Sequence, residues 1–186
     1  IRIVTPFAIN INLVDIPNNR KRHTGKIPIV GGIGIFVSIV VGLLTAQIDI
    51  NEQKNLLLAM VIVAGVGVLD DHQDLSTRSR VLMHIIAVSV VVIFDSMVLN
   101  SLGSIFGLGE LKLHTWAIFF TVFSIIGVMN AINMSDGIDG LSGFLSLIPL
   151  LFISYFSYIG GHADYLMVAL IVCAALVSFL LFNLGV

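Results

Sequence analysis

The sequence predicts an all-α protein, a polytopic bundle of helices embedded in a membrane. Of its 186 residues, 58% are hydrophobic and only 11% are charged, and the mean hydropathy is +1.08. A soluble domain carries about 25% charged residues, so this chain has too few to cover a surface that faces water. Its apolar residues also fall into long runs, most of which approach the ~20 residues that a membrane helix needs.

Six of these runs are expected to form membrane helices. They cover about 29–48, 55–69, 81–99, 114–134, 141–159 and 165–184, and residues 1–13 are interpreted as the end of an earlier helix. The second run is short, so its end should bring Asp70 close to the lipid headgroups. Polar connectors separate the runs, at 14–28, 49–54, 70–80, 100–113, 135–140 and 160–164.

No internal repeat or change of composition marks a second domain. We therefore expect one membrane domain over residues 1–186, as an internal fragment of a longer protein, because the chain opens inside one apolar stretch and stops in another. Cys173 is the only cysteine and lies in an apolar run, which excludes a disulfide framework and a cysteine-based metal site. With a net charge of −2 and no basic stripe, the chain is not expected to bind nucleic acid.

The basic residues predict the orientation in the membrane. Connectors 14–28 and 70–80 hold most of them, whereas the connectors on the opposite side hold only Lys54 and Lys112. Cytoplasmic loops carry the excess of lysine and arginine, so 14–28, 70–80 and 135–140 should be cytoplasmic. The aspartates at the helix ends on this side of the membrane are Asp70, Asp71, Asp74, Asp136 and Asp139.

The stretch "VLDDHQDLSTRSR", residues 68–80, holds a DDxxD arrangement at the end of an apolar helix. If the helix continues, Asp70 and Asp74 share a face. Carboxylates this close repel one another and need a counter-charge. Arg78 and Arg80 are candidates, and so is Mg²⁺, which takes oxygen ligands and leaves positions for phosphate oxygens. The alternative is a solvated loop whose acids only flank a helix end.

The stretch "NMSDGIDGLSG", residues 133–143, lies between two apolar runs and holds Asp136 and Asp139. Gly137 and Gly140 oppose a continuous helix, so a tight turn into the next helix is expected. Backbone N–H groups at a helix start favour anions. Asn130 and Asn133 add polar groups one turn upstream. An ordinary turn would need fewer polar residues, so the pattern favours a functional site.

The stretch "NNRKRHTGKIPIVGG", residues 18–32, is a basic loop that leads into a glycine-rich helix start. The usual excess of basic residues in cytoplasmic loops explains most of its charge. His23 and Lys26 are less easily explained in that way and are candidates for phosphate recognition. The isolated histidines, His84 among them, are instead expected to lie at interfaces or in packing.

Together the three stretches place carboxylates, basic residues and glycine turns at the cytoplasmic mouth of an apolar bundle. This arrangement suits a reaction between a water-soluble polyphosphate and a lipid held in the membrane. In phosphoryl transfer an enzyme mainly positions the reactants and offsets their charge, with Mg²⁺ bridging phosphate oxygens.

The motifs "LDDHQD", "NAINMSDGIDGLSG" and "LVDIPNNRKRHTGKIPIVGG" closely resemble those of the bacterial polyprenyl-phosphate N-acetylhexosamine-1-phosphate transferases. The resemblance spans nearly the whole chain. It implies a multi-pass enzyme of the bacterial inner (plasma) membrane, with its active site on the cytoplasmic face and Mg²⁺ or Mn²⁺ as cofactor. It implies that UDP-GlcNAc and undecaprenyl phosphate give undecaprenyl-diphospho-GlcNAc and UMP, which starts the synthesis of a surface polysaccharide or teichoic acid. A homodimer is one possible assembly.

The resemblance also implies roles for single residues. The catalytic candidates are Asp70, Asp71, Asp136 and Asp139. The substrate-binding candidates are Asn130 and Asn133, to which the basic loop itself adds His23 and Lys26. Asp70 and Asp71 are the candidate metal ligands. The family continues after the match at 179–183 with another aspartate motif and a histidine-rich loop, so this chain should hold about half of the site.

Two other classes of protein stay open on the sequence. A UbiA-type prenyltransferase also carries aspartate-rich motifs on membrane helices, but "NMSDGIDG" does not fit its second motif. A cation transporter uses intramembrane acids, but would place them near the midplane of the membrane and not all at one end. Release of UMP distinguishes the transferase from both.

Overall fold

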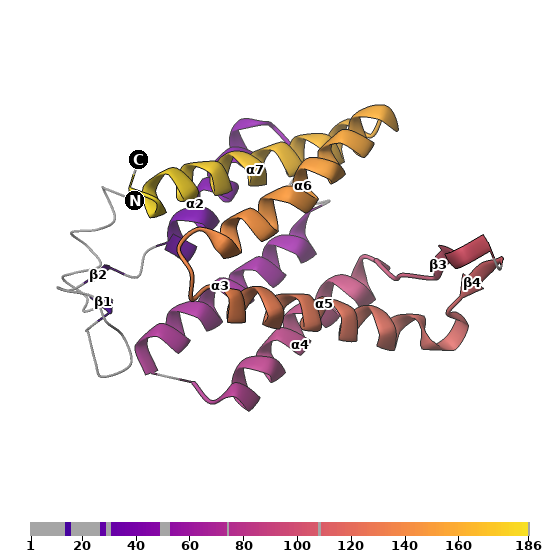
Figure 1. Cartoon of the computed structure of the whole chain (residues 1–186), viewed down its shortest axis with the longest axis horizontal. Helices are drawn as coiled ribbons and strands as arrows, with labels where there is room; N and C mark the ends of the chain where they lie inside the picture. The colour runs from indigo at the N-terminus through magenta and orange to yellow at the C-terminus, as the bar shows by residue number, and fades with distance from the viewer. Residues whose placement is uncertain are drawn as a thin grey trace.

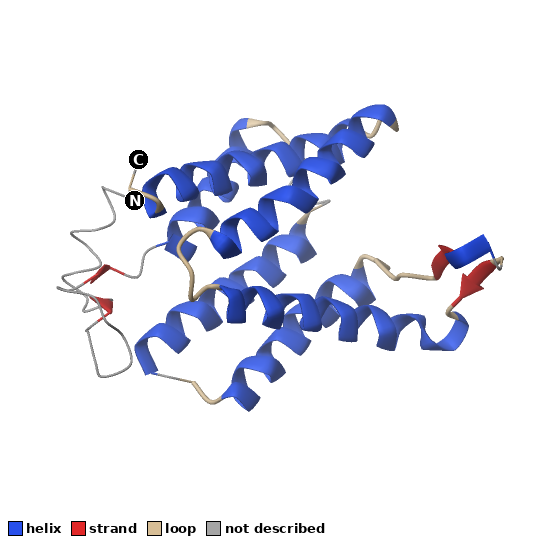
Figure 2. Cartoon of the chain, in the orientation of Figure 1, coloured by secondary structure: helices blue, strands red, loops and turns tan. Residues whose placement is uncertain are grey.

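The computed structural model describes residues 14–15, 27–28, 31–48, 53–73, 75–107 and 109–185. Six α-helices make up most of this part of the chain (Figure 1, Figure 2). They are α2 (Gly31–Thr45), α3 (Lys54–Gln73), α4 (Thr77–Phe94), α5 (Ala117–Ser135), α6 (Leu141–Ile159) and α7 (Ala163–Asn183). The prediction of an all-α bundle is confirmed.

Five of the described helices, α3 to α7, are long and apolar enough to cross a membrane. Helix α2 has 15 residues and is shorter than the usual span. Large apolar side chains remain exposed along these helices, as expected where lipid rather than water surrounds a bundle. The structure therefore agrees with a multi-pass membrane protein.

Short connections make successive helices run in opposite directions. The α3–α4 and α5–α6 connections lie at one end of the bundle, on the left in Figure 1, whereas the α6–α7 turn lies at the opposite end. Each aspartate motif sits at one of the two left-hand connections. The fold thus brings together two motifs that lie far apart in the sequence, one near Asp70 and the other near Asp136.

Helix α3 extends one turn beyond the predicted boundary at residue 69, so Asp70 and Asp71 are helical residues. Helix α4 begins soon afterwards at Thr77. Its N-cap is Ser76, whose hydroxyl oxygen accepts a hydrogen bond from the backbone N–H of Ser79 at 3.2 Å. Asp74 lies outside the described residues, so its predicted common face with Asp70 stays a prediction.

A β-hairpin occupies the connector at 100–113, where the sequence predicted no strand. Strand β3 (Ser101–Ser104) pairs antiparallel with β4 (Glu110–Lys112), and a short 3₁₀ helix follows β3. The hairpin projects at the opposite end of the molecule from the aspartate motifs (Figure 1). A second strand pair, β1 (Val14–Asp15) with β2 (Ile27–Pro28), brackets the basic loop.

Close packing against glycine joins α7 to α2 and to α6. A Cβ atom on Gly42 of α2 would lie 2.5 Å from Cγ2 of Ile171, and one on Gly143 of α6 would lie 2.6 Å from Cδ2 of Leu180. Small residues let membrane helices approach in this way, since burial from water does not drive them together. Helix α7 therefore lies against both α2 and α6, and the start of α6 is fixed beside the end of α7.

Candidate active site

The side chain of Arg80 links the two aspartate motifs. Its Nη1 atom lies 2.9 Å from Oδ2 of Asp70 at the end of α3, and donates a hydrogen bond of 3.4 Å to Oδ1 of Asn133 near the end of α5. About three quarters of both the Arg80 and Asp70 side chains are covered, with 26% and 22% exposed. The predicted counter-charge is thus present for Asp70, and it comes from Arg80.

The predicted turn between α5 and α6 is confirmed. Helix α5 ends at Ser135, and the turn closes with Gly140, whose φ of 75° lies in the left-handed region that favours glycine. Gly140 is also buried, and a Cβ atom there would lie 3.0 Å from Cδ2 of Leu184. Within the turn, Oδ1 of Asp136 accepts a hydrogen bond of 2.5 Å from the hydroxyl of Ser142. The turn therefore holds the Asp136 carboxylate against the first residues of α6.

A cavity of about 450 Å³, here called the polar cavity, opens among these residues. Its polar lining comes from α3, α4, α5, the turn and α6: Asp70, Arg80, His84, Asn133, Asp136, Ser142 and Ser146. Apolar side chains of α2, α3, α5 and α7 close the rest of the wall, among them Ile35, Val63 and Phe179. One cavity thus contains residues from both aspartate motifs.

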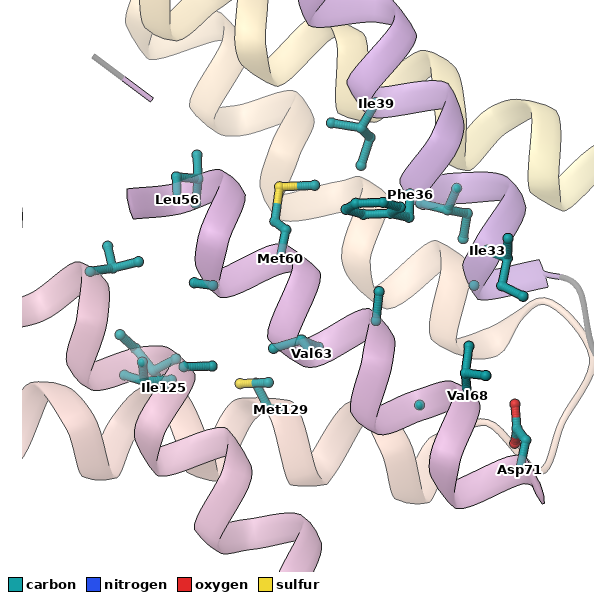
Figure 3. A pocket seen from close by; sticks show the side chains of 18 residues that line it. Ile33, Phe36, Ile39, Leu56, Met60, Val63, Val68, Asp71, Ile125 and Met129 are labelled. Carbon is teal, nitrogen blue, oxygen red and sulfur yellow. The ribbon is translucent and has the colours of Figure 1, made fainter. Parts of the chain in front are cut away.

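A second hollow of about 540 Å³, here called the apolar groove, lies between α2 and α3 and reaches α4 and α5. Figure 3 shows Phe36 and Met60 on facing helices in its middle, and Asp71 at the α3 end beyond Val68. Among the described residues that line this groove, Asp71 is the only charged one. The apolar groove therefore ends at the carboxylate of Asp71.

Asp70 and Asp71 serve different hollows although they are neighbours in the sequence. Asp70 lines the polar cavity and Asp71 lines the apolar groove. Successive residues of an α-helix point about 100° apart, so two adjacent aspartates on α3 face the two hollows on either side of it. The aspartate pair stands where an apolar and a polar compartment meet.

The structure brings together only part of the predicted site. Asp139 is exposed, and neither it nor Asn130 lines either hollow; the amide of Asn130 lies 3.8 Å from Sδ of Met134 on its own helix. His23 and Lys26 lie outside the described residues. The predicted roles of all four residues stay predictions.

Three polar residues of the cavity were missed by the sequence reasoning. His84 was expected at an interface or in packing, and it lines the polar cavity one turn after Arg80. Ser142 and Ser146, one turn apart on α6, line the same cavity. The spacing of four residues was the available signal, because residues at i and i+4 share one face of a helix.

The fit of a divalent cation can be judged from the donor atoms. Asp70, Asn133 and Asp136 offer carboxylate and amide oxygens, which are ligands that Mg²⁺ accepts. Among the described residues, however, no three histidine, cysteine, aspartate or glutamate side chains are grouped closely enough to hold a metal by themselves. Mg²⁺ is often held by one or two carboxylates together with substrate phosphates, and the cavity fits this mode.

Residues 54–185 match the family model described as "Glycosyl transferase family 4". This match covers more than half of the chain and includes both aspartate motifs. The chain belongs to this family. Its matched region runs from the start of α3 to the end of α7 and contains each of the described helices that is long enough to cross a membrane.

Curated relatives carry the name undecaprenyl-phosphate alpha-N-acetylglucosaminyl 1-phosphate transferase. The protein of Salmonella typhi is 38% identical over 117 residues, which are 63% of this chain and 32% of the relative. That of Escherichia coli K12 is 35% identical with the same coverage, and that of Yersinia pestis is 34% identical over 66% of this chain and 33% of its own length. The chain thus matches about a third of the length of these relatives.

Proposed function

We propose that the intact protein transfers N-acetylglucosamine-1-phosphate from UDP-GlcNAc to undecaprenyl phosphate and releases UMP. Membership of glycosyl transferase family 4 and the printed names of the relatives support this reaction. The structural observation that carries it is the placement of Asp70 in a polar cavity and of Asp71 in an apolar groove. A soluble nucleotide sugar and a membrane lipid need two such compartments side by side.

The two substrates differ in polarity, and the two hollows match this difference. The apolar groove offers a surface for the prenyl chain, because apolar contacts replace contacts with lipid there at little cost. The polar cavity offers Arg80 and Asn133 to the diphosphate of the nucleotide. A guanidinium group suits phosphate, since its planar fork of N–H donors matches the phosphate oxygens.

In the proposed reaction, an oxygen of the lipid phosphate forms a bond to the sugar-bearing phosphorus of UDP-GlcNAc. The bond from that phosphorus to the UMP oxygen breaks, and UMP leaves with the bonding electrons. Asp71 lies on the groove side, where it can hold or accept a proton of the lipid phosphate. Mg²⁺ or Mn²⁺, bound with Asp70 and Asp136 as candidate ligands, would offset the negative charge of the phosphates.

The site is less suited to the other two classes. A transporter would hold its acids near the middle of the membrane, whereas Asp70, Asp71 and Asp136 all lie at one end of the helices. A prenyltransferase would release pyrophosphate from a prenyl diphosphate. Nothing in the matched family or in the names of the relatives points to that reaction.

The proposal is tested by the release of UMP from UDP-GlcNAc with the purified intact protein. We expect release only when undecaprenyl phosphate and Mg²⁺ or Mn²⁺ are both present. EDTA should stop the reaction and added Mg²⁺ should restore it, because the carboxylates and the phosphates are both negative and need a cation to offset their charge. Release that needs no lipid acceptor, or release of pyrophosphate from a prenyl diphosphate instead, would contradict the proposal.

We also propose that the end of the bundle with the aspartates faces the bacterial cytoplasm. In a Cys173→Ala background, a cysteine at Ile138 lies in the exposed α5–α6 turn and a cysteine at Ser104 in the opposite hairpin. In intact cells a membrane-impermeant thiol reagent should label the Ser104→Cys protein but not the Ile138→Cys protein. Permeabilised cells provide the control, since both proteins should then react. Labelling of the Ile138→Cys protein in intact cells would show that the end with the aspartates faces the outside, and would contradict the proposed orientation.

A further inference from the structure

The apolar groove and the polar cavity share part of their walls. Five residues line both hollows: Gly32, Ile35, Val63, Gly67 and Met129. Two of them are glycines, one in the first turn of α2 and one on α3, one turn before Asp70 and Asp71. The hollows are therefore adjacent along the gap between α2 and α3, close to the aspartate pair.

The two shared glycines face open space. A Cβ atom placed on Gly32 or Gly67 would meet no neighbouring atom within 4 Å. The packed glycines behave differently, since a Cβ atom on Gly31 would lie 2.7 Å from the ring of Phe179. Close helix packing therefore explains the glycine at position 31 but not those at positions 32 and 67.

The charges on the two sides differ. Arg80, in the polar cavity, is the only lysine or arginine among the described residues that line the two hollows, and it attracts a phosphate although Asp70 and Asp136 line the same cavity. A lipid that lays its prenyl chain in the groove therefore gains most if its phosphate group reaches the polar cavity. The shared wall at Gly32 and Gly67 lies directly between these two places.

We propose that Gly32 and Gly67 form a portal through which the phosphate of the prenyl acceptor passes from the apolar groove into the polar cavity. This inference rests on the proposed function, because the acceptor is the lipid named there. The missing side chains keep the portal wide enough for a phosphate group. Gly67 is thus a positioning residue for the acceptor, placed where the apolar groove meets the polar cavity.

The chain offers a matched control on the same helix. Gly65 is also a helical glycine of α3 with no atom within 4 Å of an added Cβ, but it lines neither hollow. Gly65→Leu and Gly67→Leu therefore change helix propensity and apolarity equally. They differ only in whether the new side chain enters the portal.

The test measures UMP release and lipid binding with the intact protein. Gly67→Leu should raise the KM for undecaprenyl phosphate about tenfold or more, because the added methylenes occupy the path of the phosphate. The KM for UDP-GlcNAc should change less than about twofold. Gly67→Ala should give a smaller rise in the lipid KM, and Gly65→Leu should resemble the wild type.

A second measurement does not depend on activity. Undecaprenyl phosphate added without nucleotide should raise the thermal unfolding temperature of the wild type and of Gly65→Leu, but not of Gly67→Leu. The portal proposal would be wrong if Gly67→Leu left the KM for undecaprenyl phosphate unchanged. It would also be wrong if Gly65→Leu raised this KM, or lost stabilisation by the lipid, as much as Gly67→Leu. The two proposals can fail separately. If the wild type releases no UMP, but the lipid stabilises the wild type and Gly65→Leu and does not stabilise Gly67→Leu, the proposed reaction is wrong and the portal is supported.

Discussion

An Asp71→Asn variant of the intact protein is expected to release UMP about 100-fold more slowly than the wild type, or slower still. Asparagine keeps the size and most of the hydrogen bonding of aspartate but removes its charge. A 100-fold loss corresponds to about 2.7 kcal/mol of transition-state stabilisation, which is typical for the loss of one well-placed electrostatic group. The measurement is the rate of UMP release with both substrates saturating.

The dependence on Mg²⁺ separates two roles for Asp71. If the carboxylate is a metal ligand, raising Mg²⁺ should restore part of the lost rate; if it holds a proton of the lipid phosphate, extra Mg²⁺ should have no effect. Asp164→Asn is the control, because Asp164 lies in the first turn of α7 at the opposite end of the bundle. Its rate should stay within about twofold of the wild type. A near-normal rate for Asp71→Asn would make this carboxylate structural.

Much of the bundle can be predicted from the sequence because membrane helices need long apolar runs. The runs predicted at 141–159 and 165–184 match α6 and α7 almost residue for residue. Boundaries within polar stretches were less accurate. Helix α3 continues to Gln73 and α4 begins at Thr77, because polar residues at a membrane surface are as compatible with a helix as with a loop.

The strands were missed for a related reason. Strands β3 and β4 have four and three residues, too few for an alternating apolar pattern to be recognised. Gly103 and Gly107 take positive φ values of 74° and 72° in this hairpin. Glycines of this kind indicate a turn, but they do not show which residues pair across it.

The site was predicted as three stretches at one mouth of the bundle, and the fold shows what joins two of them. Composition and spacing singled out the aspartates and Asn133, but Arg80 and Asn133 are 53 residues apart and their contact depends on how α4 packs against α5. The division of Asp70 and Asp71 between two hollows likewise depends on the position of α2 beside α3. Such relations between helices leave no pattern in a single sequence.

The central position of Arg80 predicts the second large effect. Its guanidinium pairs with Asp70 and donates to Asn133, so Arg80→Gln should leave two carboxylates, Asp70 and Asp136, in the polar cavity without the cation between the motifs. We expect kcat/KM for UDP-GlcNAc to fall about 100-fold, since a charged group that meets the phosphates is lost. Arg80→Lys keeps the charge but not the planar fork, so its loss should be smaller, about tenfold.

Arg78 provides the matched control for this prediction. It is exposed and lies at the start of α4, as Arg80 does. Arg78→Gln removes the same charge from the same helix, yet it leaves the link between Asp70 and Asn133 intact. Its kcat/KM should stay within a few-fold of the wild type, and thermal unfolding should show that all three variants are folded. If Arg78→Gln and Arg80→Gln lose equal activity, the basic residues act through the orientation of the chain in the membrane. The contact of Arg80 with both motifs would then have no catalytic meaning.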